Sequence, residues 1–410
     1  MEKDIQYYKF CAYGFLRNLR FFEAFLILFL LQKGMSYTSI GILYALREVS
    51  ANILEIPSGI AADVLGRKKT LAASFLAYIF SFLILYLFQS FILIIIGFLL
   101  YGAGEAFRSG THKGMIADYL KSTGRKEQMI LYYGHTRSWS QNGLAVSSLI
   151  AGFIVFYSGS YNSIFLFSTI PYILNLILGV SYPAFLDKSG HLLKGQKRQE
   201  VKRVISDSIN TLKNRKVLNL INITALHTAY LKAMKDYLQP MLVSLILLLP
   251  LLTDKSNEQR SAVLIGIIYF FIFILTSIAS NSAGKLAASS MKKIPEYTLA
   301  AGLISGVLSG ILYLRGFNYG AVFFFICIYI IENLRKPVLT GYVSENVDNS
   351  ILTSVLSVQS QLKTIFTAII ALSFGIIADF AGIGWSLVSI SLSLMFFSFI
   401  INIISSVKRL

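Results

Sequence analysis

Residues 91–117 read FILIIIGFLLYGAGEAFRSGTHKGMIA, an apolar stretch long enough to cross a bilayer that nevertheless contains Glu105 and Arg108. A charged side chain in the hydrocarbon costs about 2.5 to 3.5 kcal/mol on the mildest insertion scale, so it needs a local reason to be there. The same unit recurs 227 residues later, where Glu332 and Arg335 lie inside another apolar stretch. This repetition predicts a duplicated membrane bundle with a polar centre, and therefore a protein that moves something across a membrane.

The rest of the chain extends this membrane pattern from end to end. Of its 410 residues, 55% are hydrophobic and only 14% are charged, which is too apolar for a soluble protein. A membrane helix needs about 20 apolar residues, and twelve stretches of this kind predict an all-α integral membrane protein. The predicted spans are 8–32, 38–62, 70–89, 91–117, 129–157, 161–183, 217–250, 261–283, 297–314, 318–342, 350–378 and 384–406. They use up the length, so no room is left for a soluble catalytic domain.

Signals for other classes of protein do not occur in the sequence. Residues 1–9 lack the regions of a cleaved signal peptide. Cys11 and Cys327 lie in different predicted spans, which indicates neither a disulfide framework nor a metal site. Without a nucleophile–base set, a metal cluster or a phosphate-binding loop, we expect neither an enzyme nor a bound cofactor.

The net charge of +17 is mostly a topology signal. About 22 of the 37 Lys and Arg residues fall in alternate loops and at both ends of the chain, and only about four fall in the opposite loops. This positive-inside bias predicts a multi-pass protein of the cytoplasmic membrane with both termini in the cytoplasm. A nucleic-acid partner is not expected, because no aromatic residues interleave the basic ones.

One long polar segment divides the chain. Residues 184–215 are rich in Lys and Arg, with apolar residues at helical spacing, which predicts a cytoplasmic linker whose amphipathic helix lies near the lipid headgroups. Six spans precede it and six follow it. The expected domains are therefore an N-terminal six-helix bundle (1–183), the linker (184–215) and a C-terminal six-helix bundle (216–410).

The two bundles repeat a second charged pattern. The first span contains Arg17 and Arg20, and the seventh contains Lys232 and Lys235 with the same spacing. Parallel repeats with a substrate site near the middle of the membrane are a known transporter design. The predicted spans contain eleven basic and six acidic side chains. Since arginine does not lose its proton in proteins, the excess of positive charge favours an anionic ligand.

These charges give the predicted sites. We expect the substrate to be bound by Arg17, Arg20, Arg108, His112, Lys232, Lys235, Arg335 and Lys363. Proton coupling or charge pairing is expected of Glu23, Glu48, Glu105, Asp236 and Glu332. Helical spacing predicts the internal pairs Arg20–Glu23, Glu105–Arg108, Glu332–Arg335 and Lys232–Asp236. For His112, a purely structural role stays equally open, and the residues that open the fifth span, His135 and Arg137 among them, are expected to pack at an inner gate.

The loop between the second and third spans resembles a family signature. Residues 59–69 read GIAADVLGRKK and are similar to the G-x-x-x-D-x-x-G-R-K/R loop of the major facilitator superfamily. The resemblance extends over the whole chain and implies twelve transmembrane helices in two pseudo-symmetric six-helix bundles. It also implies an inner-gate motif in which the loop arginine pairs with an acid at the inner end of span four. The matching residues are Gly59, Asp63, Gly66, Arg67 and Asp118.

The leading interpretation is a secondary active transporter, acting as a monomer by alternating access on a small solute bearing phosphate or carboxylate. The coupling partner is a proton or an exchanged anion. A proton-coupled multidrug efflux antiporter is the alternative within transport, because this loop signature is common in drug–proton antiporters and 14% aromatic residues could furnish a drug pocket. A membrane sensor or assembly factor is the alternative outside transport.

Overall fold

The structure is a computed structural model that describes residues 3–187, 215–247, 252–287, 294–347 and 349–406. Every regular element in these ranges is a helix, and none of them contains a β-strand, which confirms the predicted all-α membrane fold. The α-helices up to the linker are α1 (Ile5–Arg17), α2 (Leu26–Gln32), α3 (Tyr37–Leu65), α4 (Arg67–Leu87), α5 (Phe91–Arg108), α6 (Thr111–Ser122), α7 (Met129–Ser158) and α8 (Ser163–Val180). Those after it are α10 (Arg215–Met234), α11 (Leu238–Ile246), α12 (Asn257–Ala287), α13 (Ile294–Leu314), α14 (Asn318–Asn346) and α15 (Asn349–Ser406).

Each predicted span corresponds to helix in the structure, although not always to one unbroken helix. Seven helical segments in the described ranges are long and apolar enough to cross a membrane on those grounds alone. The remaining spans are the ones that are interrupted, α1–α2 and α10–α11, or that carry several charged side chains, α3 and α14. The polar features that weaken the membrane signal therefore fall in the spans of the predicted sites.

Glycines with positive φ break helices at two places, one inside a predicted span and one between two predicted spans. The predicted span 91–117 is divided into α5 and α6 at Gly110, whose φ of 78° is accessible to glycine at little cost. The predicted spans 350–378 and 384–406 lie on either side of Gly382 (φ 87°), the non-helical residue within α15, so this break falls where the sequence predicts it.

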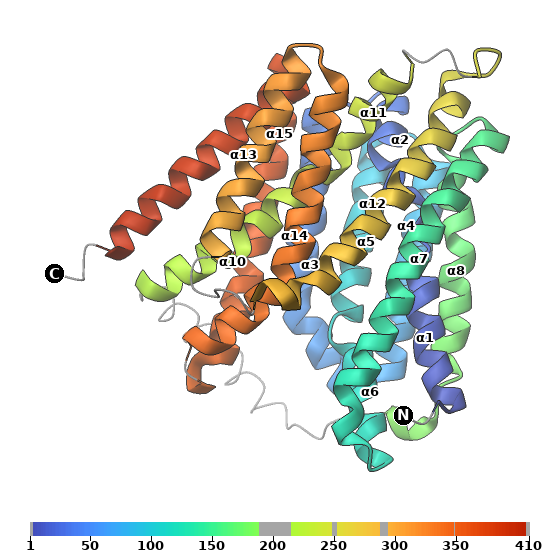
Figure 1. The fold of residues 1–410 in the computed structure, drawn as a ribbon. Coiled ribbons are helices and arrows are strands. Elements are labelled where there is room, and N and C mark those ends of the chain that lie inside the picture. Colours follow the sequence, from blue (N-terminus) through green and yellow to red (C-terminus); the bar gives the residue numbers. More distant parts are fainter. Residues whose placement is uncertain (1–2, 188–214, 248–251, 288–293, 348, 407–410) are drawn as a thin grey trace. The chain divides into compact units, whose positions relative to one another are not determined.

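The chain forms two compact units that differ from simple sequence halves (Figure 1). Unit 1 comprises residues 1–33, 46–197 and 250–273, and unit 2 comprises residues 34–45, 198–249 and 274–410. The start of α3 thus belongs with unit 2, and the first half of α12 belongs with unit 1. The division at 184–215 stays a prediction, because residues 188–214, with the expected amphipathic helix, lie outside the described residues.

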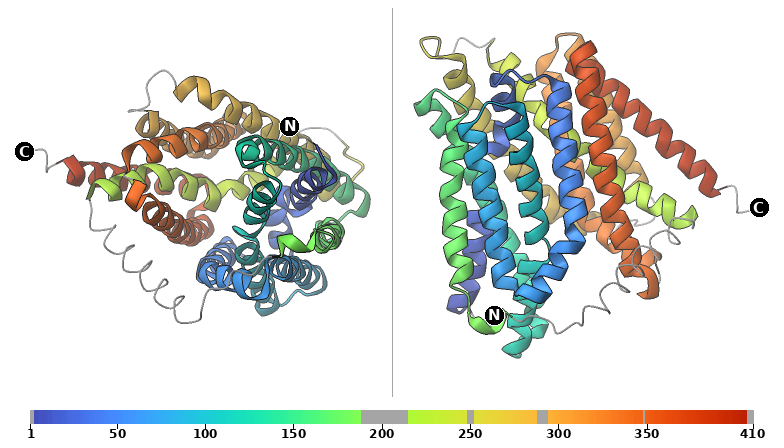
Figure 2. Two further views of the ribbon diagram at one scale, coloured as in Figure 1. Left: turned by 90° about the horizontal axis from the view of Figure 1, so that it is seen from below. Right: turned by 180° about the vertical axis from the view of Figure 1, so that it is seen from behind.

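In unit 1, α4 packs between α5 and α8, as the right-hand view of Figure 2 shows. The first half of α12 approaches α7 closely because both helices present glycine. A Cβ atom at Gly152 would lie 2.8 Å from the Ala262 carbonyl oxygen and 3.3 Å from the Gly266 Cα atom. Near this contact, the hydroxyls of Tyr161 and Ser261 are 2.8 Å apart. Small residues are the usual means by which membrane helices pack backbone against backbone.

We expect Gly152→Ala to lower the stability of the protein, since the added methyl group forces α7 and α12 apart. Overpacking of this kind costs about 1 to 3 kcal/mol, and thermal unfolding in detergent measures it. Gly134→Ala on the same helix is the matched control, because a Cβ atom at Gly134 meets nothing within 4 Å. Equal melting temperatures for the two variants would contradict the close packing.

The contacts at one end of unit 1 join the N-terminal segment, the loop after α6 and the start of α4. Asp4 accepts hydrogen bonds from the Tyr7 amide (2.8 Å), the Tyr119 hydroxyl (2.5 Å) and the Arg125 guanidinium (2.7 Å). Asp187 accepts a hydrogen bond from the Lys68 amide at 2.8 Å. Segments expected on the cytoplasmic side therefore lie together at one end of this unit. Their cytoplasmic orientation stays a prediction.

The Asp4 carboxyl group makes the stability of this end of unit 1 depend on pH. Burial alone would raise the pKa of its carboxyl group, but the hydrogen bonds from Tyr119 and Tyr7 and the Arg125 guanidinium hold that pKa below its ordinary value of 3.8. A carboxyl group with a lowered folded-state pKa stabilises the fold above its unfolded-state pKa. That stabilisation is lost as the pH falls through the folded-state pKa.

Asp4→Asn is accordingly expected to lower the melting temperature at pH 7, and the deficit should shrink as the pH falls below 3.8. Melting curves of detergent-solubilised protein across this pH range measure the effect. Asp254→Asn serves as the control, because Asp254 is an exposed loop residue whose ion pair among the described residues is with its neighbour Lys255. A deficit that is independent of pH would show that the Asp4 carboxylate is not its source.

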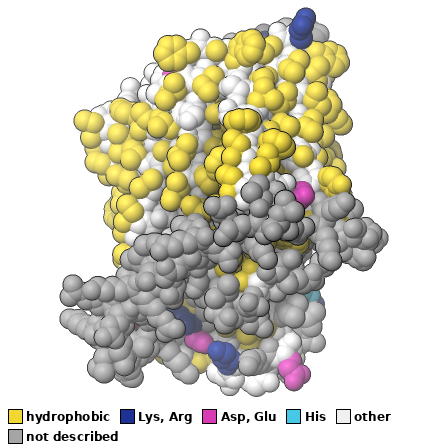
Figure 3. Space-filling view, turned by 90° about the vertical axis from the view of Figure 1, so that its left-hand side faces the viewer, with side chains coloured by type: hydrophobic (Ala, Val, Ile, Leu, Met, Phe, Trp, Pro, Cys, Tyr) yellow, Lys and Arg dark blue, Asp and Glu magenta, His cyan; other side chains and the backbone are white. Residues whose placement is uncertain are grey.

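The described surface is strongly apolar. Figure 3 shows one face on which hydrophobic side chains cover most of the described area. Large exposed apolar residues occur on helices of both units, including Ile92, Phe153, Phe323 and Phe396. Such a surface would aggregate in water and suits the hydrocarbon of a bilayer.

Candidate functional site

The basic pair of the first span lies at a break in the helix. α1 ends at Arg17, and a 3₁₀ turn, η1 (Phe21–Ala24), separates it from α2. The side-chain amide of Asn18 donates a hydrogen bond to the Gly14 carbonyl at 2.7 Å and so binds one of the carbonyls at the helix end. Cations are favoured at a helix C-terminus, where the unpaired carbonyls carry partial negative charge.

The seventh span repeats this arrangement. α10 ends at Met234, and a second 3₁₀ turn, η4 (Lys235–Tyr237), leads into α11. Lys232 lies in the last turn of α10 and Lys235 opens η4. The predicted repeat of basic pairs is thus also a repeat of interrupted helices, and interrupted helices are where transporters of known design hold charged solutes.

One carboxylate organises the charges of unit 1. Glu105 accepts from Arg17 at 2.9 Å and from Arg108 at 2.8 Å, and it lies 3.5 Å from the guanidinium of Arg20. Arg20 also contacts Glu23 at 3.3 Å. The expected pairs Glu105–Arg108 and Arg20–Glu23 are therefore present. In addition, the structure joins Arg17 to Glu105 across two spans, a contact that spacing within one helix cannot reveal.

Beside this cluster lies a cavity of about 610 Å³ within unit 1. Its walls come from α1, α6, α7 and the end of α5. Four basic side chains line it, namely Arg17, Arg108, Lys113 and Arg137, and none of its described lining residues is acidic. Polar groups of Asn18, Ser109, Thr136 and Ser140 complete the polar part of the wall.

Two of these four cations are not neutralised. Lys113 and Arg137 have exposed side chains, and no described carboxylate forms an ion pair with either. The sequence predicts an inner-gate position for Arg137 and gives Lys113 no place in the site. Lys113 reaches the cavity because the break at Gly110 determines where α6 lies, and Arg137 reaches it because α7 packs against α1.

His112 has a more structural setting than its neighbours. Its ring stacks on Tyr13 with centroids 3.5 Å apart, and its Nε2 atom lies 3.2 Å from the Tyr182 hydroxyl. The ring also borders the cavity. Both interpretations of this histidine therefore stay open, with packing as the contact that the structure documents.

In unit 2, Asp236 of η4 is the partner of the basic turn. Its carboxylate lies 3.7 Å from Lys235 Nζ and accepts a hydrogen bond from the Tyr44 hydroxyl at 2.8 Å. Lys232 and Lys363 are half-buried on α10 and α15. The cavity of unit 1 does not include these side chains.

The predicted pair Glu332–Arg335 is wrong in the structure. Arg335 instead donates to the carbonyls of Pro295 and Ile223 and to the Thr298 hydroxyl, each at 2.6 Å. Arg335 is 1% exposed, and its three acceptors lie on two other helices, α13 and α10. The buried guanidinium therefore holds α14 against those helices.

Glu332 has different partners, one of which the sequence analysis missed. It accepts from His227 Nδ1 at 2.7 Å and from the Thr228 hydroxyl at 2.6 Å, while Lys336 Nζ lies 3.9 Å away. His227 gave no sequence signal beyond its place in the seventh span, because its partner lies 105 residues away on α14.

The inner-gate motif forms the contact that its resemblance implies. Arg67, the first residue of α4, donates to Asp118 of α6 at 2.6 Å. Gly114 makes room for it, since a Cβ atom there would lie 2.7 Å from Arg67 Nη1. Gly66 precedes α4 with a φ of 96°, and Gly59 and Asp63 lie in the last turns of α3.

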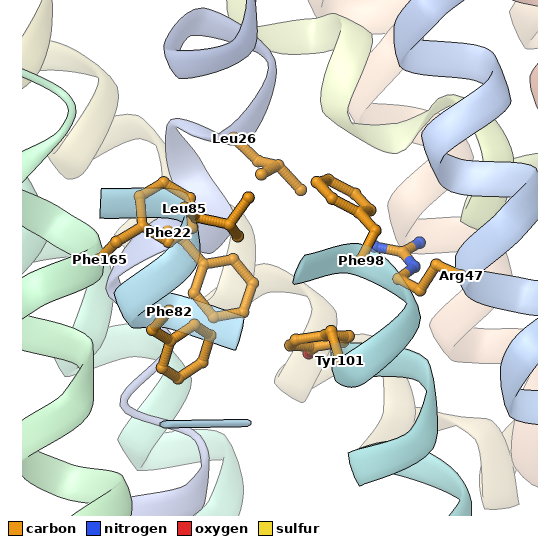
Figure 4. A pocket seen from close by; sticks show the side chains of 8 residues that line it. All are labelled: Phe22, Leu26, Arg47, Phe82, Leu85, Phe98, Tyr101 and Phe165. Carbon is orange, nitrogen blue, oxygen red and sulfur yellow. The ribbon is translucent and has the colours of Figure 1, made fainter. Parts of the chain in front are cut away.

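An aromatic pocket lies near the remaining predicted acid, Glu48, which is buried and 3.3 Å from Arg47. Phe22, Phe82, Phe98, Tyr101 and Phe165 line this pocket together with two leucines, and the Arg47 side chain lies at one side of it beside Phe98 (Figure 4). The enclosed volume is about 10 Å³, which is room for about one water molecule. The pocket is therefore a packed aromatic cluster in this structure.

Comparison with known proteins settles the family. The sequence model of the Major Facilitator Superfamily matches residues 10–363 of the chain. The chain belongs to the Major Facilitator Superfamily. It is accordingly a multi-pass membrane transporter of the secondary class, which confirms the family and the coarse function expected from the sequence.

Individual relatives agree on the family and differ in what they carry. The chain is 22% identical to the uncharacterized MFS-type transporter YxaM of Bacillus subtilis (strain 168), over 97% of this chain and 96% of that protein. A mutant form of the nucleoside transporter NupG superposes with a TM-score of 0.76 at 14% identity, covering 96% of this chain and 99% of that one. A D-xylose-proton symporter gives a TM-score of 0.63 at 14% identity, over 95% of each chain. At such identities the structural likeness establishes the MFS fold alone.

The Arg67–Asp118 contact of this MFS protein gives a direct test. In a double-mutant cycle of Arg67→Gln and Asp118→Asn, thermal unfolding should yield a coupling energy of about 0.5 to 1 kcal/mol, as expected for a half-exposed ion pair. Lys69→Gln combined with Asp118→Asn is the matched control, since Lys69 is exposed on the same helix. Coupling no larger than that of the control pair would remove Arg67–Asp118 as an inner-gate contact.

Proposed function

We propose that the protein is a secondary transporter that carries a small phosphate- or carboxylate-bearing anion across the cytoplasmic membrane by alternating access. The observation that carries this proposal is the cavity of unit 1, with four basic side chains and no acidic one among its described lining residues. Glu105 balances at most one of the charges on Arg17 and Arg108. Lys113 and Arg137 add two more, so the cavity has an excess of positive charge.

A positive cavity inside a membrane bundle favours an anion for electrostatic reasons. The low dielectric of the surroundings strengthens the attraction between the cavity and a ligand of opposite charge. Guanidinium groups match the geometry of carboxylate and phosphate with two parallel hydrogen bonds. A bound anion would also neutralise the cavity and so lower the cost of moving it through the membrane during reorientation.

The site proposed for the anion is smaller than the set expected from the sequence. It comprises Arg17, Arg108, Lys113 and Arg137 in unit 1. Arg20 supports it through Glu23 and Glu105. Lys232, Lys235 and Lys363 stay candidate binding residues within unit 2, whereas Arg335 is assigned to helix packing by its three hydrogen bonds.

A drug-transport function has weaker support in the same structure. A pocket for lipophilic cations would be aromatic and acidic. The aromatic pocket of unit 1 contains Arg47 among its lining residues and encloses about 10 Å³. This composition favours an anionic substrate over a cationic drug.

The test is a thermal-shift screen of the purified protein against inorganic phosphate, phosphate monoesters, citrate and cationic drugs. A ligand at about 100 times its Kd stabilises the folded state by about 2.7 kcal/mol, which is readily measured. We expect stabilisation by one or more of the anions, and loss of that stabilisation in Arg137→Gln and Arg17→Gln.

Lys255→Gln is the matched control, because Lys255 lies in a loop remote from the cavity lining and pairs with Asp254. It should keep the full response to the anion. Stabilisation by the cationic drugs alone, or an anion response that survives Arg137→Gln and Arg17→Gln unchanged, would overturn the proposed function.

A further inference from the structure

Unit 2 contains a buried pair of titratable groups that the anion site does not use. His227 of α10 and Glu332 of α14 are 0% and 1% exposed, with His227 Nδ1 2.7 Å from Glu332 Oε2. The Thr228 hydroxyl donates to the other carboxylate oxygen at 2.6 Å. Both oxygens of Glu332 thus have donors, and the carboxylate is held in its ionised form by direct contacts.

The second nitrogen of the imidazole has no such partner. His227 Nε2 is fully buried, and no atom of the described residues forms a hydrogen bond with it. It points at Gly302 of α13, where a Cβ atom would lie 1.9 Å from it. Only glycine leaves space for the ring edge at this position. Buried polar atoms are normally hydrogen-bonded, so this unpartnered nitrogen needs an explanation.

Arg335 provides the contrast within the same unit. It is equally buried, and two of its terminal nitrogens have three acceptors at 2.6 Å on neighbouring elements. Its Nε atom, like His227 Nε2, is buried without a partner among the described residues, but a guanidinium nitrogen has no lone pair that could take up a proton. His227 is satisfied on one side only, and the open side is a lone pair or an N–H group, depending on whether the ring carries a proton.

We propose that His227 and Glu332 form a proton-binding centre, in which His227 takes up the proton that is coupled to transport of the anion. The proposal rests on the proposed anion transport for its role in the cycle. The step is simple in chemical terms. A proton from water bonds to the Nε2 lone pair, the neutral imidazole becomes an imidazolium, and no other bond forms or breaks. Glu332 stabilises the imidazolium through the Nδ1 hydrogen bond.

The groups around the pair make the binding of the proton reversible. On α14, Lys336 Nζ lies 3.9 Å from Glu332 Oε1, and Arg335 is one turn from Glu332. On α10, the Tyr230 ring lies 6.2 Å from the imidazole, edge to face. α13 contributes Gly302 to the contact. The positive charges of Lys336 and Arg335 repel an imidazolium at this place, so a bound proton can leave again. Lys336 is half-exposed, which gives the centre an edge toward solvent.

The first test needs no substrate. The full-length protein has four histidines, so ¹⁵N-imidazole labelling gives few signals, and His227→Gln identifies the one from the centre. We expect the His227 signal to titrate within the pH range in which the protein stays folded. Glu332→Gln should move the midpoint down by about one unit or more, because the stabilising charge is lost. A His227 signal that stays constant over this range overturns the proposal, as does a midpoint unaffected by Glu332→Gln.

The second test connects the centre to transport. Vesicles containing the protein are loaded with labelled phosphate or citrate, whichever protects the protein in the thermal-shift screen. We expect His227→Gln to keep exchange of the anion at equal pH and to lose accumulation driven by a pH gradient. His135→Gln is the matched control, because His135 lies in unit 1 and contacts Tyr7.

The failures of the two proposals are distinguishable. If no anion protects the protein, the proposed function fails, while the histidine titration still decides whether the centre binds a proton. If an anion is exchanged and His227→Gln retains gradient-driven accumulation, the proton centre is overturned and the anion site stands. Should His227→Gln fail to fold, Glu332→Gln and the titration of the unsubstituted protein provide the same decision.

Discussion

Glu105 holds three guanidinium groups in the interior of unit 1, and much of that unit depends on this shared contact. Arg17 and Arg20 come from the interrupted first span, and Arg108 from the end of α5. Removing one partner of a buried ion pair costs about 3 to 5 kcal/mol because it leaves an uncompensated charge. Here the loss would leave three like charges close together. The carboxylate thus reduces the repulsion among these arginines inside the membrane and still leaves the cavity with a net positive charge.

The two Glu-x-x-Arg units show how one sequence pattern serves two purposes. In unit 1 the helix ends at Arg108, Gly110 turns the chain, and the arginine borders the cavity. In unit 2 α14 continues through Glu332 and Arg335, and both side chains are enclosed by neighbouring helices. The difference lies in the backbone after the motif. Under our two proposals, the repeated pattern contributes to a solute site in unit 1 and to a proton site in unit 2.

Much of the architecture was predictable because it depends on composition and period. The twelve apolar stretches, the repeat of basic pairs and the Arg67–Asp118 contact follow from hydrophobicity, spacing and a family motif. The breaks at η1 and η4 did not follow, since residues 17–25 and 234–238 contain neither glycine nor proline. Tertiary contacts set those breaks. Gly110 did carry a local signal inside a predicted span, and the break at Gly382 falls between two predicted spans.

The partners of Glu332 illustrate a different limit. Helical spacing made Arg335 the natural partner, and the structure gives His227 in its place because α10 lies against α14. Contacts between helices compete with contacts along one helix, and a single sequence reveals only the second kind. The same applies to Arg137, whose place in the cavity depends on how α7 packs against α1.

Gly302 has a consequence for the history of this fold. Its missing side chain and the His227 ring occupy the same space, so the two positions cannot change independently. A lineage that replaced the glycine would first have to shorten the residue at 227, and with it the proton chemistry proposed for that residue. Gly306, where a Cβ atom would collide with the Tyr230 hydroxyl, imposes the same order one turn further along α13. Joint variation of position 302 with 227, and of 306 with 230, is thus the evolutionary signature that we expect this packing to leave among relatives.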